Sequence, residues 1–179
     1  MRIVVFGSTG RVGGSIVTQA LEAGHEVVAY ARPASVGRLP PGIEVHEGEL
    51  DDAGAITKAV AGADAVLSGL GARANRADQV PMLAGAYERI CAAMAEAGVK
   101  RLVAISGSAT RLPDEPVSFG RGVLRMVMKL LDRHVLRANE AAARVMIATE
   151  LEWVIVRPPR IADGGPTGKR AADRNATPS

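Results

Sequence analysis

One cluster in this sequence combines residue types and a spacing that could do chemistry, namely the glycine-rich segment GSTGRVG at residues 7–13. It stands between a short apolar run, residues 2–6, and a stretch with helical spacing of apolar residues, residues 11–23. Amide groups at the start of a helix, together with the positive end of the helix dipole, form a site for anions such as pyrophosphate. Its placement between strand and helix therefore predicts that this turn holds the phosphates of a dinucleotide.

Each glycine of the turn has an expected role. Gly7 permits a sharp turn, Gly10 has no Cβ to block a phosphate, and Gly13 lets the helix pack closely on the strand. The pattern is GxxGxxG rather than the common GxGxxG. The alternative is a glycine-rich turn that serves packing alone. The expected phosphate-binding residues are Gly7, Ser8, Thr9, Gly10, Arg11, Val12 and Gly13.

The residue that follows the second strand predicts which dinucleotide binds. An Asp or Glu about 20 residues beyond the glycines binds the ribose 2′-hydroxyl of NAD. This chain has Arg32 there, nineteen residues after Gly13, and a guanidinium pairs with a 2′-phosphate instead. Arg11 could reach the same phosphate. We therefore expect NADP(H) as the cofactor, the alternative being that Arg32 is an ordinary solvated side chain.

The elements that must position these residues alternate along the chain. Apolar runs predict strands at 2–6, 26–31, 43–46, 64–68, 101–106 and 152–156, and helical spacing predicts helices at 11–23, 52–61 and 78–97. This alternation is typical of βαβ units around a parallel sheet. We expect an α/β domain over residues 1–162, a Rossmann-like doubly wound parallel sheet with helices on both faces. The polar residues 163–179 are expected to form a flexible tail.

The composition excludes several classes of protein. A length of 179 residues, 47% of them hydrophobic and 23% charged, suits one folded domain. No apolar run is long enough to span a bilayer and no signal peptide is recognised, so a cytoplasmic location is expected. One cysteine and three scattered histidines argue against a metal site. A net charge of +3 with 3% aromatic residues does not favour nucleic acid, so the expected partner is a small molecule.

In its glycine turn, at Arg32 and in several later segments, the chain resembles the atypical NAD(P)H-binding branch of the short-chain dehydrogenase/reductase superfamily. That branch includes NmrA-like proteins and biliverdin-IXβ/flavin reductases. The resemblance covers about residues 1–168. It is carried by Arg32 and by FGSTGRVG (6–13), GELDD (48–52), GADAVLSGLG (62–71), RLVAISGSA (101–109) and LEWVIVRPPRIAD (151–163).

The resemblance also implies roles for loops that spacing alone does not assign. Residues 48–52 would line the adenine, through Glu49, Leu50 and Asp51. Residues 68–71 would pass the ribose and nicotinamide, through Gly69, Leu70 and Gly71. The region of Ser106 and the Pro-Pro turn would frame the nicotinamide and its acceptor.

The chain departs from the superfamily in its proton-transfer pair. The dehydrogenases and epimerases use Tyr-x-x-x-Lys, but here Tyr30 and Tyr87 are followed four residues later by Ala34 and Cys91. Alcohol oxidation and sugar epimerisation are therefore not expected. The flavin and biliverdin reductases also lack the pair; there, hydride passes directly to a stacked planar acceptor and solvent supplies the proton. They carry a histidine where this chain has Arg160.

Three residues are candidates for contact with the acceptor: Ser106, Ser108 and Arg160. Both serines follow the fifth strand, where a hydroxyl could donate to a carbonyl or relay a proton, or could merely satisfy the backbone of the turn. Arg157 and Arg160 flank Pro158 and Pro159, where two cations suit a carboxylate or phosphate, or are ordinary surface charge.

Residues 119–150 should form two helices with a break near residues 137–139. Cations recur there every four residues, at Arg121, Arg125, Lys129, Arg133 and Arg137, beside a row of apolar side chains. The segment could be a lid, a surface for an acidic partner, a membrane-surface helix, or an amphipathic helix that packs on the sheet with a solvated basic face.

Two functions from different classes stay open. The first is an NADPH-dependent reductase of a planar acceptor such as a flavin or quinone. The second is a regulatory protein of the NmrA-like type, which binds the dinucleotide without turning it over. The missing tyrosine–lysine pair and the short C-terminus motivate the second. A homodimer is compatible with the sequence, since a partner could complete the outer wall of the pocket.

Overall fold

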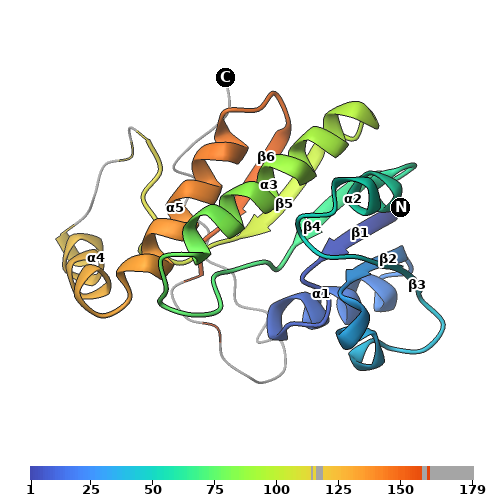
Figure 1. Cartoon of the computed structure of the whole chain (residues 1–179), viewed down its shortest axis with the longest axis horizontal. Coiled ribbons are helices and arrows are strands. Elements are labelled where there is room, and N and C mark those ends of the chain that lie inside the picture. Colours follow the sequence, from blue (N-terminus) through green and yellow to red (C-terminus); the bar gives the residue numbers. More distant parts are fainter. Residues whose placement is uncertain (114, 116–118, 159–160, 162–179) are drawn as a thin grey trace.

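The computed structural model describes residues 1–113, 115, 119–158 and 161 (Figure 1). The strands are β1 (Arg2–Phe6), β2 (Glu26–Ala31), β3 (Glu44–Glu47), β4 (Ala65–Ser68), β5 (Arg101–Ile105) and β6 (Glu152–Val156). The helices are α1 (Arg11–Glu22), the 3₁₀ helix η1 (Pro33–Arg38), α2 (Ala53–Val60), α3 (Gln79–Glu96), α4 (Phe119–Leu131) and α5 (Arg133–Ile147).

The six strands form one parallel sheet in the order β3-β2-β1-β4-β5-β6. The register aligns the strand ends: Phe6 pairs with Tyr30 and with Ser68, and Ser68 pairs with Ala104. The loops after all these strands therefore meet at one edge, the carboxyl edge of the sheet, where open α/β folds bind ligands. The expected Rossmann-like doubly wound fold is confirmed.

Helices cover both faces of the sheet (Figure 1). On one face α2, α3 and α5 pack against the strands around Phe6, Tyr87 and Leu102, which are fully buried. On the other face α1 covers β1 and β2 through Val17, which packs with Val5 and Val27. Because the central strands are buried on both sides, they read as continuous apolar runs in the sequence.

One local expectation was wrong, and one short helix was not expected. The break between α4 and α5 falls at Asp132 rather than at residues 137–139, because Asp132, with φ −133° and ψ 45°, leaves the helical conformation and is the N-cap of α5, which begins at Arg133. Aspartate favours this N-terminal position, although here its side chain makes no capping hydrogen bond. The turn of η1, which begins directly after Arg32, was not foreseen; Pro33 at its first position suits a helix start.

The position of α4 also differs from the alternative in which this segment is an amphipathic helix that packs on the sheet. α4 packs against α5 and lies at one end of the molecule, away from the sheet (Figure 1). Several of its apolar side chains are exposed, with Leu130 at 79%. Arg125, by contrast, is half-buried and forms an ion pair with Glu140 of α5. The basic row is therefore not a continuous solvated face, and the break at Asp132 divides it.

The predicted tail, residues 163–179, lies outside the described residues. Within the described part of the chain, none of the helices combines the length and apolar character needed to cross a lipid bilayer. The same part of the chain contains no group of three or more His, Cys, Asp or Glu residues that could hold a metal ion.

Candidate functional site at the carboxyl edge

The glycine turn between β1 and α1 is built on close backbone contacts. Gly7 has a φ of +70°, which favours glycine, and its carbonyl accepts a hydrogen bond of 2.9 Å from the amide of Gly10. A Cβ on Gly13 would lie 2.0 Å from the carbonyl oxygen of Gly7. The expected roles of Gly7 and Gly13 in the turn are confirmed. Gly10 is the N-cap of α1 and has no side chain to occupy the amides of the first helical turn.

The loop after β4 lies directly against this turn. A Cβ on Gly69 would come 2.7 Å from the amide nitrogen of Gly13, and one on Gly7 would come 3.0 Å from the carbonyl carbon of Gly69. Gly7 of the turn, Gly13 in the first turn of α1 and Gly69 of the loop after β4 therefore meet backbone to backbone. Leu70 is buried beside them and Gly71 is exposed. The structure thus brings together residues 7–13 and 69–71, as the resemblance implies.

A chain of hydrogen bonds joins the glycine turn to the loop after β3. The hydroxyl of Ser8, which is buried, donates to the carbonyl of Tyr30 at 2.9 Å, so this hydroxyl is already engaged. The phenol of Tyr30 in turn donates to the carbonyl of Glu49 at 2.8 Å. A Cβ on Gly48 would lie 2.3 Å from the Tyr30 hydroxyl oxygen, so this contact requires a glycine. Glu49 and Asp51 are exposed, and Leu50 is half-buried.

The cations expected near a 2′-phosphate lie at the same edge. Arg32 follows β2, is half-buried and is the N-cap of η1. Arg11 is exposed in the first turn of α1, and its guanidinium donates to the carbonyl of Ile161 at 3.2 Å. Arg38, exposed in the last turn of η1, is a further cation on this loop that sequence reasoning did not single out. Thr9 and Val12 are half-buried in the turn.

The loop after β5 holds the two candidate serines. Ser106 donates its amide to the carbonyl of Val156 at 2.8 Å, and its hydroxyl oxygen lies 3.0 Å from that of Thr110. Ser108 is half-buried. Thr110, which is fully buried, was missed from the sequence, where the only signal is a hydroxyl residue four positions after Ser106. The side chains of Ser106 and Thr110 thus support each other at the end of the strand.

Arg157 does not offer a free cation to an anionic ligand. Its guanidinium makes two hydrogen bonds, of 2.7 and 2.8 Å, to the carboxylate of Glu115, and a third of 2.9 Å to the carbonyl of Thr110. The Glu115 side chain is 2% exposed. This buried pair holds the loop after β5 against the end of β6. Arg160, the other cation of the expected pair, lies outside the described residues.

Neither tyrosine is prepared for proton transfer. Burial raises the pKa of Tyr30 to about 12, with added repulsion from nearby carboxylates, and burial raises the pKa of Tyr87 to about 12. The phenol oxygen of Tyr87 is 2.8 Å from the hydroxyl of Ser68, deep in the core. A catalytic tyrosine needs a lowered pKa, so these environments agree with the missing lysine.

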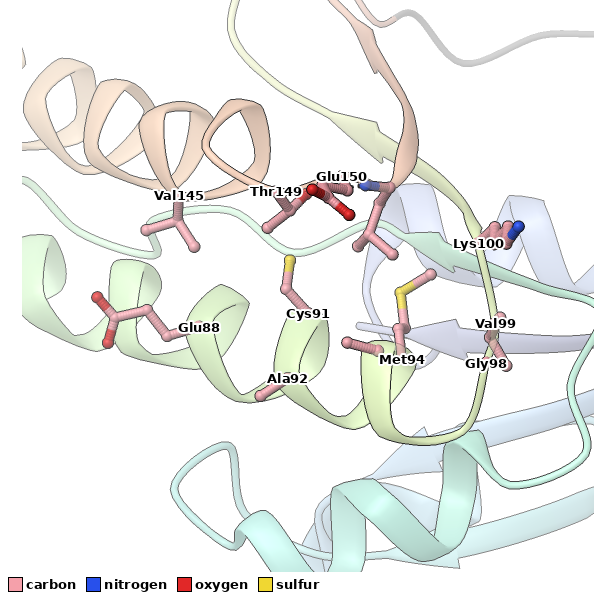
Figure 2. A pocket seen from close by; sticks show the side chains of 12 residues that line it. Glu88, Cys91, Ala92, Met94, Gly98, Val99, Lys100, Val145, Thr149 and Glu150 are labelled. Atoms are coloured by element: carbon pink, nitrogen blue, oxygen red, sulfur yellow. Dashed lines mark hydrogen bonds between the residues drawn. The ribbon is translucent and has the colours of Figure 1, made fainter.

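A pocket of about 520 Å³ lies elsewhere, between the C-terminal parts of α3 and α5 (Figure 2). Lys100 and Leu151 belong to its lining and come just before β5 and β6, so the pocket sits at the amino end of those strands. None of the predicted site residues lines it. Its thiol, Cys91, is buried, and burial raises the pKa of this thiol to about 11. A buried thiol that stays protonated is a poor nucleophile, so Cys91 does not make this pocket a catalytic site.

The predicted loops therefore lie in a row along one edge of the sheet. From the loop after β3 to the loop after β5 the row crosses four strand spacings, roughly 19 Å, which suits an extended ligand. The glycine contacts leave a cradle without side chains at the start of α1, and the residues present fit a dinucleotide. Fold and site together define a Rossmann-type α/β protein whose glycine cradle suits a dinucleotide.

Comparison with known proteins agrees with this class. Residues 7–179 match the family described as NAD(P)H-binding, so the chain belongs to this NAD(P)H-binding family. A (4-alkanoyl-5-oxo-2,5-dihydrofuran-3-yl)methyl phosphate reductase from Streptomyces griseus is 30% identical over 87% of this chain, which spans 46% of that relative. The chain is thus about half the length of this relative.

Solved structures show the same fold. ChuY, an anaerobillin reductase from Escherichia coli O157:H7, superposes with a TM-score of 0.75 at 22% identity, over 94% of this chain and 77% of that one. A short-chain dehydrogenase/reductase from Veillonella parvula in complex with NADP has a TM-score of 0.67 at 20% identity, over 87% and 68%. The expected membership of an NAD(P)H-binding family with a Rossmann-like fold is confirmed.

Proposed function

We propose that the chain binds NADPH along the carboxyl edge and reduces a planar acceptor, of the flavin or quinone type, by direct hydride transfer. The observation that carries the proposal is the cradle formed by Gly7, Gly13 and Gly69, where backbone meets backbone below the start of α1. Reductases among the relatives and structural neighbours support reductive chemistry.

The pyrophosphate would be held by amides of residues 8–12 other than that of Gly10, which already donates to the carbonyl of Gly7, with the positive end of the α1 dipole behind them. Arg32 would pair with the 2′-phosphate, because a guanidinium can donate to two phosphate oxygens at once. Glu49, Leu50 and Asp51 would border the adenine. Gly69, Leu70 and Gly71 would pass the ribose and nicotinamide.

At the acceptor end the protein acts by positioning. The bound cofactor supplies the hydride, and the proton that completes the reduction comes from solvent. Ser106, supported by Thr110, and Ser108 would donate hydrogen bonds to a carbonyl of the acceptor, which stabilises the charge that develops there. Arg160 stays a prediction for the same region. The Glu115–Arg157 pair keeps this loop in place.

A second candidate is a regulatory protein that binds the dinucleotide without turnover. Its support is the state of Tyr30 and Tyr87, both engaged in hydrogen bonds and both with a raised pKa. Direct hydride transfer needs neither tyrosine, so this observation leaves the reductase open. The two candidates differ in one outcome only, which is turnover.

The deciding experiment follows the absorbance of NADPH with riboflavin, FMN, FAD and menadione as acceptors. The reductase proposal expects turnover with at least one of them, and a lower kcat in Ser106→Ala than in a matched Ser15→Ala variant on the exposed part of α1. Tight binding of NADPH with no turnover of any acceptor would favour the regulatory candidate. Absence of NADPH binding would reject both.

A further inference from the structure

Helix α4 presents an apolar stripe to solvent. The stripe consists of Val123 (44% exposed), Met126 (60%), Val127 (41%), Leu130 (79%) and Leu131 (67%). Their spacing of three and four residues places them along one face of the helix. A folded protein rarely leaves such a continuous apolar row in water unless the row has a partner.

The surroundings of this stripe are positively charged. No acidic residue occurs between Phe119 and Leu131. Lys129 is exposed on α4, and Arg133 and Arg137 are exposed on the first turns of α5. One carboxylate, Asp132, directly follows the stripe, and the carboxylate of α5, Glu140, already pairs with Arg125.

The loop after β4 adds to this charge. The side chain of Asn75 donates to the carbonyl of Leu131 at 2.7 Å and accepts from the amide of His134 at 2.9 Å. These two hydrogen bonds fix the loop against the junction of α4 and α5. Arg73, two residues away, is exposed, whereas Arg76 pairs with Asp78 at 2.9 Å. The partner of the stripe must therefore be both apolar and anionic.

We propose that α4 docks the protein on an anionic lipid surface, with the apolar stripe inserted at the boundary between headgroups and acyl chains. A helix with one apolar face and cations beside it lies in the plane of such an interface. At 13 residues α4 is about 20 Å long, so it lies on a bilayer rather than crossing it.

Charge and shape favour lipid over a protein partner. A second copy packed through the same face would bring Lys129, Arg133 and Arg137 near their counterparts, with Asp132 as the single carboxylate in residues 119–139 to oppose them. The stripe is also a convex surface of protruding Leu, Met and Val side chains. Such a surface enters a deformable lipid boundary directly, while a protein partner would need a matching groove.

The test measures co-sedimentation of the full chain with vesicles of phosphatidylcholine alone and of phosphatidylcholine mixed equally with phosphatidylglycerol. Wild type is expected to bind the anionic vesicles and to be released by salt. The double variant Leu130→Gln/Leu131→Gln should lose at least about tenfold in binding. Lys129→Gln should lose about fivefold.

Two exposed residues on other helices provide matched controls: Leu21→Gln on α1 and Lys58→Gln on α2 should bind as wild type does. Circular dichroism and NADPH affinity of all variants are expected to match wild type, which separates this proposal from the nucleotide site. Absence of wild-type binding to anionic vesicles would overturn the proposal. So would unchanged binding in the leucine double variant, or a wild-type dimer that this variant dissociates, because the stripe would then serve a second copy.

Discussion

Replacing Gly13 by Ala tests how closely the glycine turn and α1 must approach. The new Cβ would lie 2.0 Å from the carbonyl oxygen of Gly7 and 2.5 Å from its carbonyl carbon. Both are backbone atoms, so the contact can open only if the turn and the helix separate by about 1 Å. Overpacking that a side chain cannot relieve costs about 3 kcal/mol. For a chain of this length that loss lowers Tm by roughly 6–12 °C.

The same displacement should weaken nucleotide binding. Each charge-assisted hydrogen bond from an amide contributes about 1.5–3 kcal/mol, so the loss of one lowers NADPH affinity by roughly 10- to 100-fold. Gly14→Ala is the matched control, because its Cβ would meet only the carbonyl oxygen of Ser8, at an ordinary 3.6 Å. Alanine within a helix is favoured over glycine by about 0.5–1 kcal/mol, so Gly14→Ala should be as stable as wild type or more so.

The assay pairs thermal unfolding with calorimetric titration of NADPH for wild type and both variants. Gly13→Ala should have the lower Tm and the lower affinity, while Gly14→Ala keeps both. If Gly13→Ala binds NADPH as tightly as wild type and has the same Tm as Gly14→Ala, the close contact does not shape the phosphate site. The argument for the cradle would then fail.

Three further predictions concern single side chains. Arg32→Ala should lower NADPH affinity about tenfold and leave NADH affinity unchanged, while Arg38→Ala in the same loop should change neither affinity. Calorimetry with both nucleotides would contradict this if Arg32→Ala lowered the affinities for NADPH and NADH equally. Glu115→Ala should lower the free energy of unfolding in urea by about 3–5 kcal/mol, because it leaves Arg157 buried and uncompensated. Glu152→Ala, which removes an exposed pair with Arg101, should change it by under about 0.5 kcal/mol. Equal effects of the two variants would refute the buried-pair argument. Burial raises the pKa of Cys91 from 9.0 to about 11, so the native thiol should react with Ellman's reagent at pH 8 about 100-fold more slowly than the thiol of the unfolded chain. Because the unfolded thiol ionises first, the free energy of unfolding should fall as pH rises from 9 towards 11. An equally fast reaction of the native protein would disprove this.

Most of the sheet could be predicted from the sequence because local and tertiary preferences agree there. The run at residues 2–6 is apolar throughout most of its length since β1 pairs with strands on both sides and is covered on both faces. The turn after it needs a positive φ at Gly7 and a missing Cβ at Gly13, and both needs are visible as glycines. The position of Gly69, by contrast, followed from a resemblance, since its contact with Gly13 joins residues far apart in the chain.

What could not be predicted depends on contacts between distant side chains. Arg157 reads as a free cation beside a rigid turn, but it is neutralised by Glu115, forty-two positions away, and no local pattern links them. The apolar residues of α4 recur with the same periodicity as those of a helix that packs on a sheet. Spacing alone therefore does not reveal whether this apolar face is buried or exposed to solvent. The helix break at Asp132 is hidden because apolar residues continue past it at helical intervals.

Calorimetric titration of the purified chain with NADPH, NADP⁺ and NADH examines the cradle and its guanidinium most directly. We predict that all three nucleotides bind at one site and that NADPH binds more tightly than NADH, with Arg32→Ala removing the difference. Absence of heat with every nucleotide, confirmed by an unchanged Tm in their presence, would contradict binding at the start of α1. Equal affinity for NADPH and NADH in wild type would contradict the role given to Arg32.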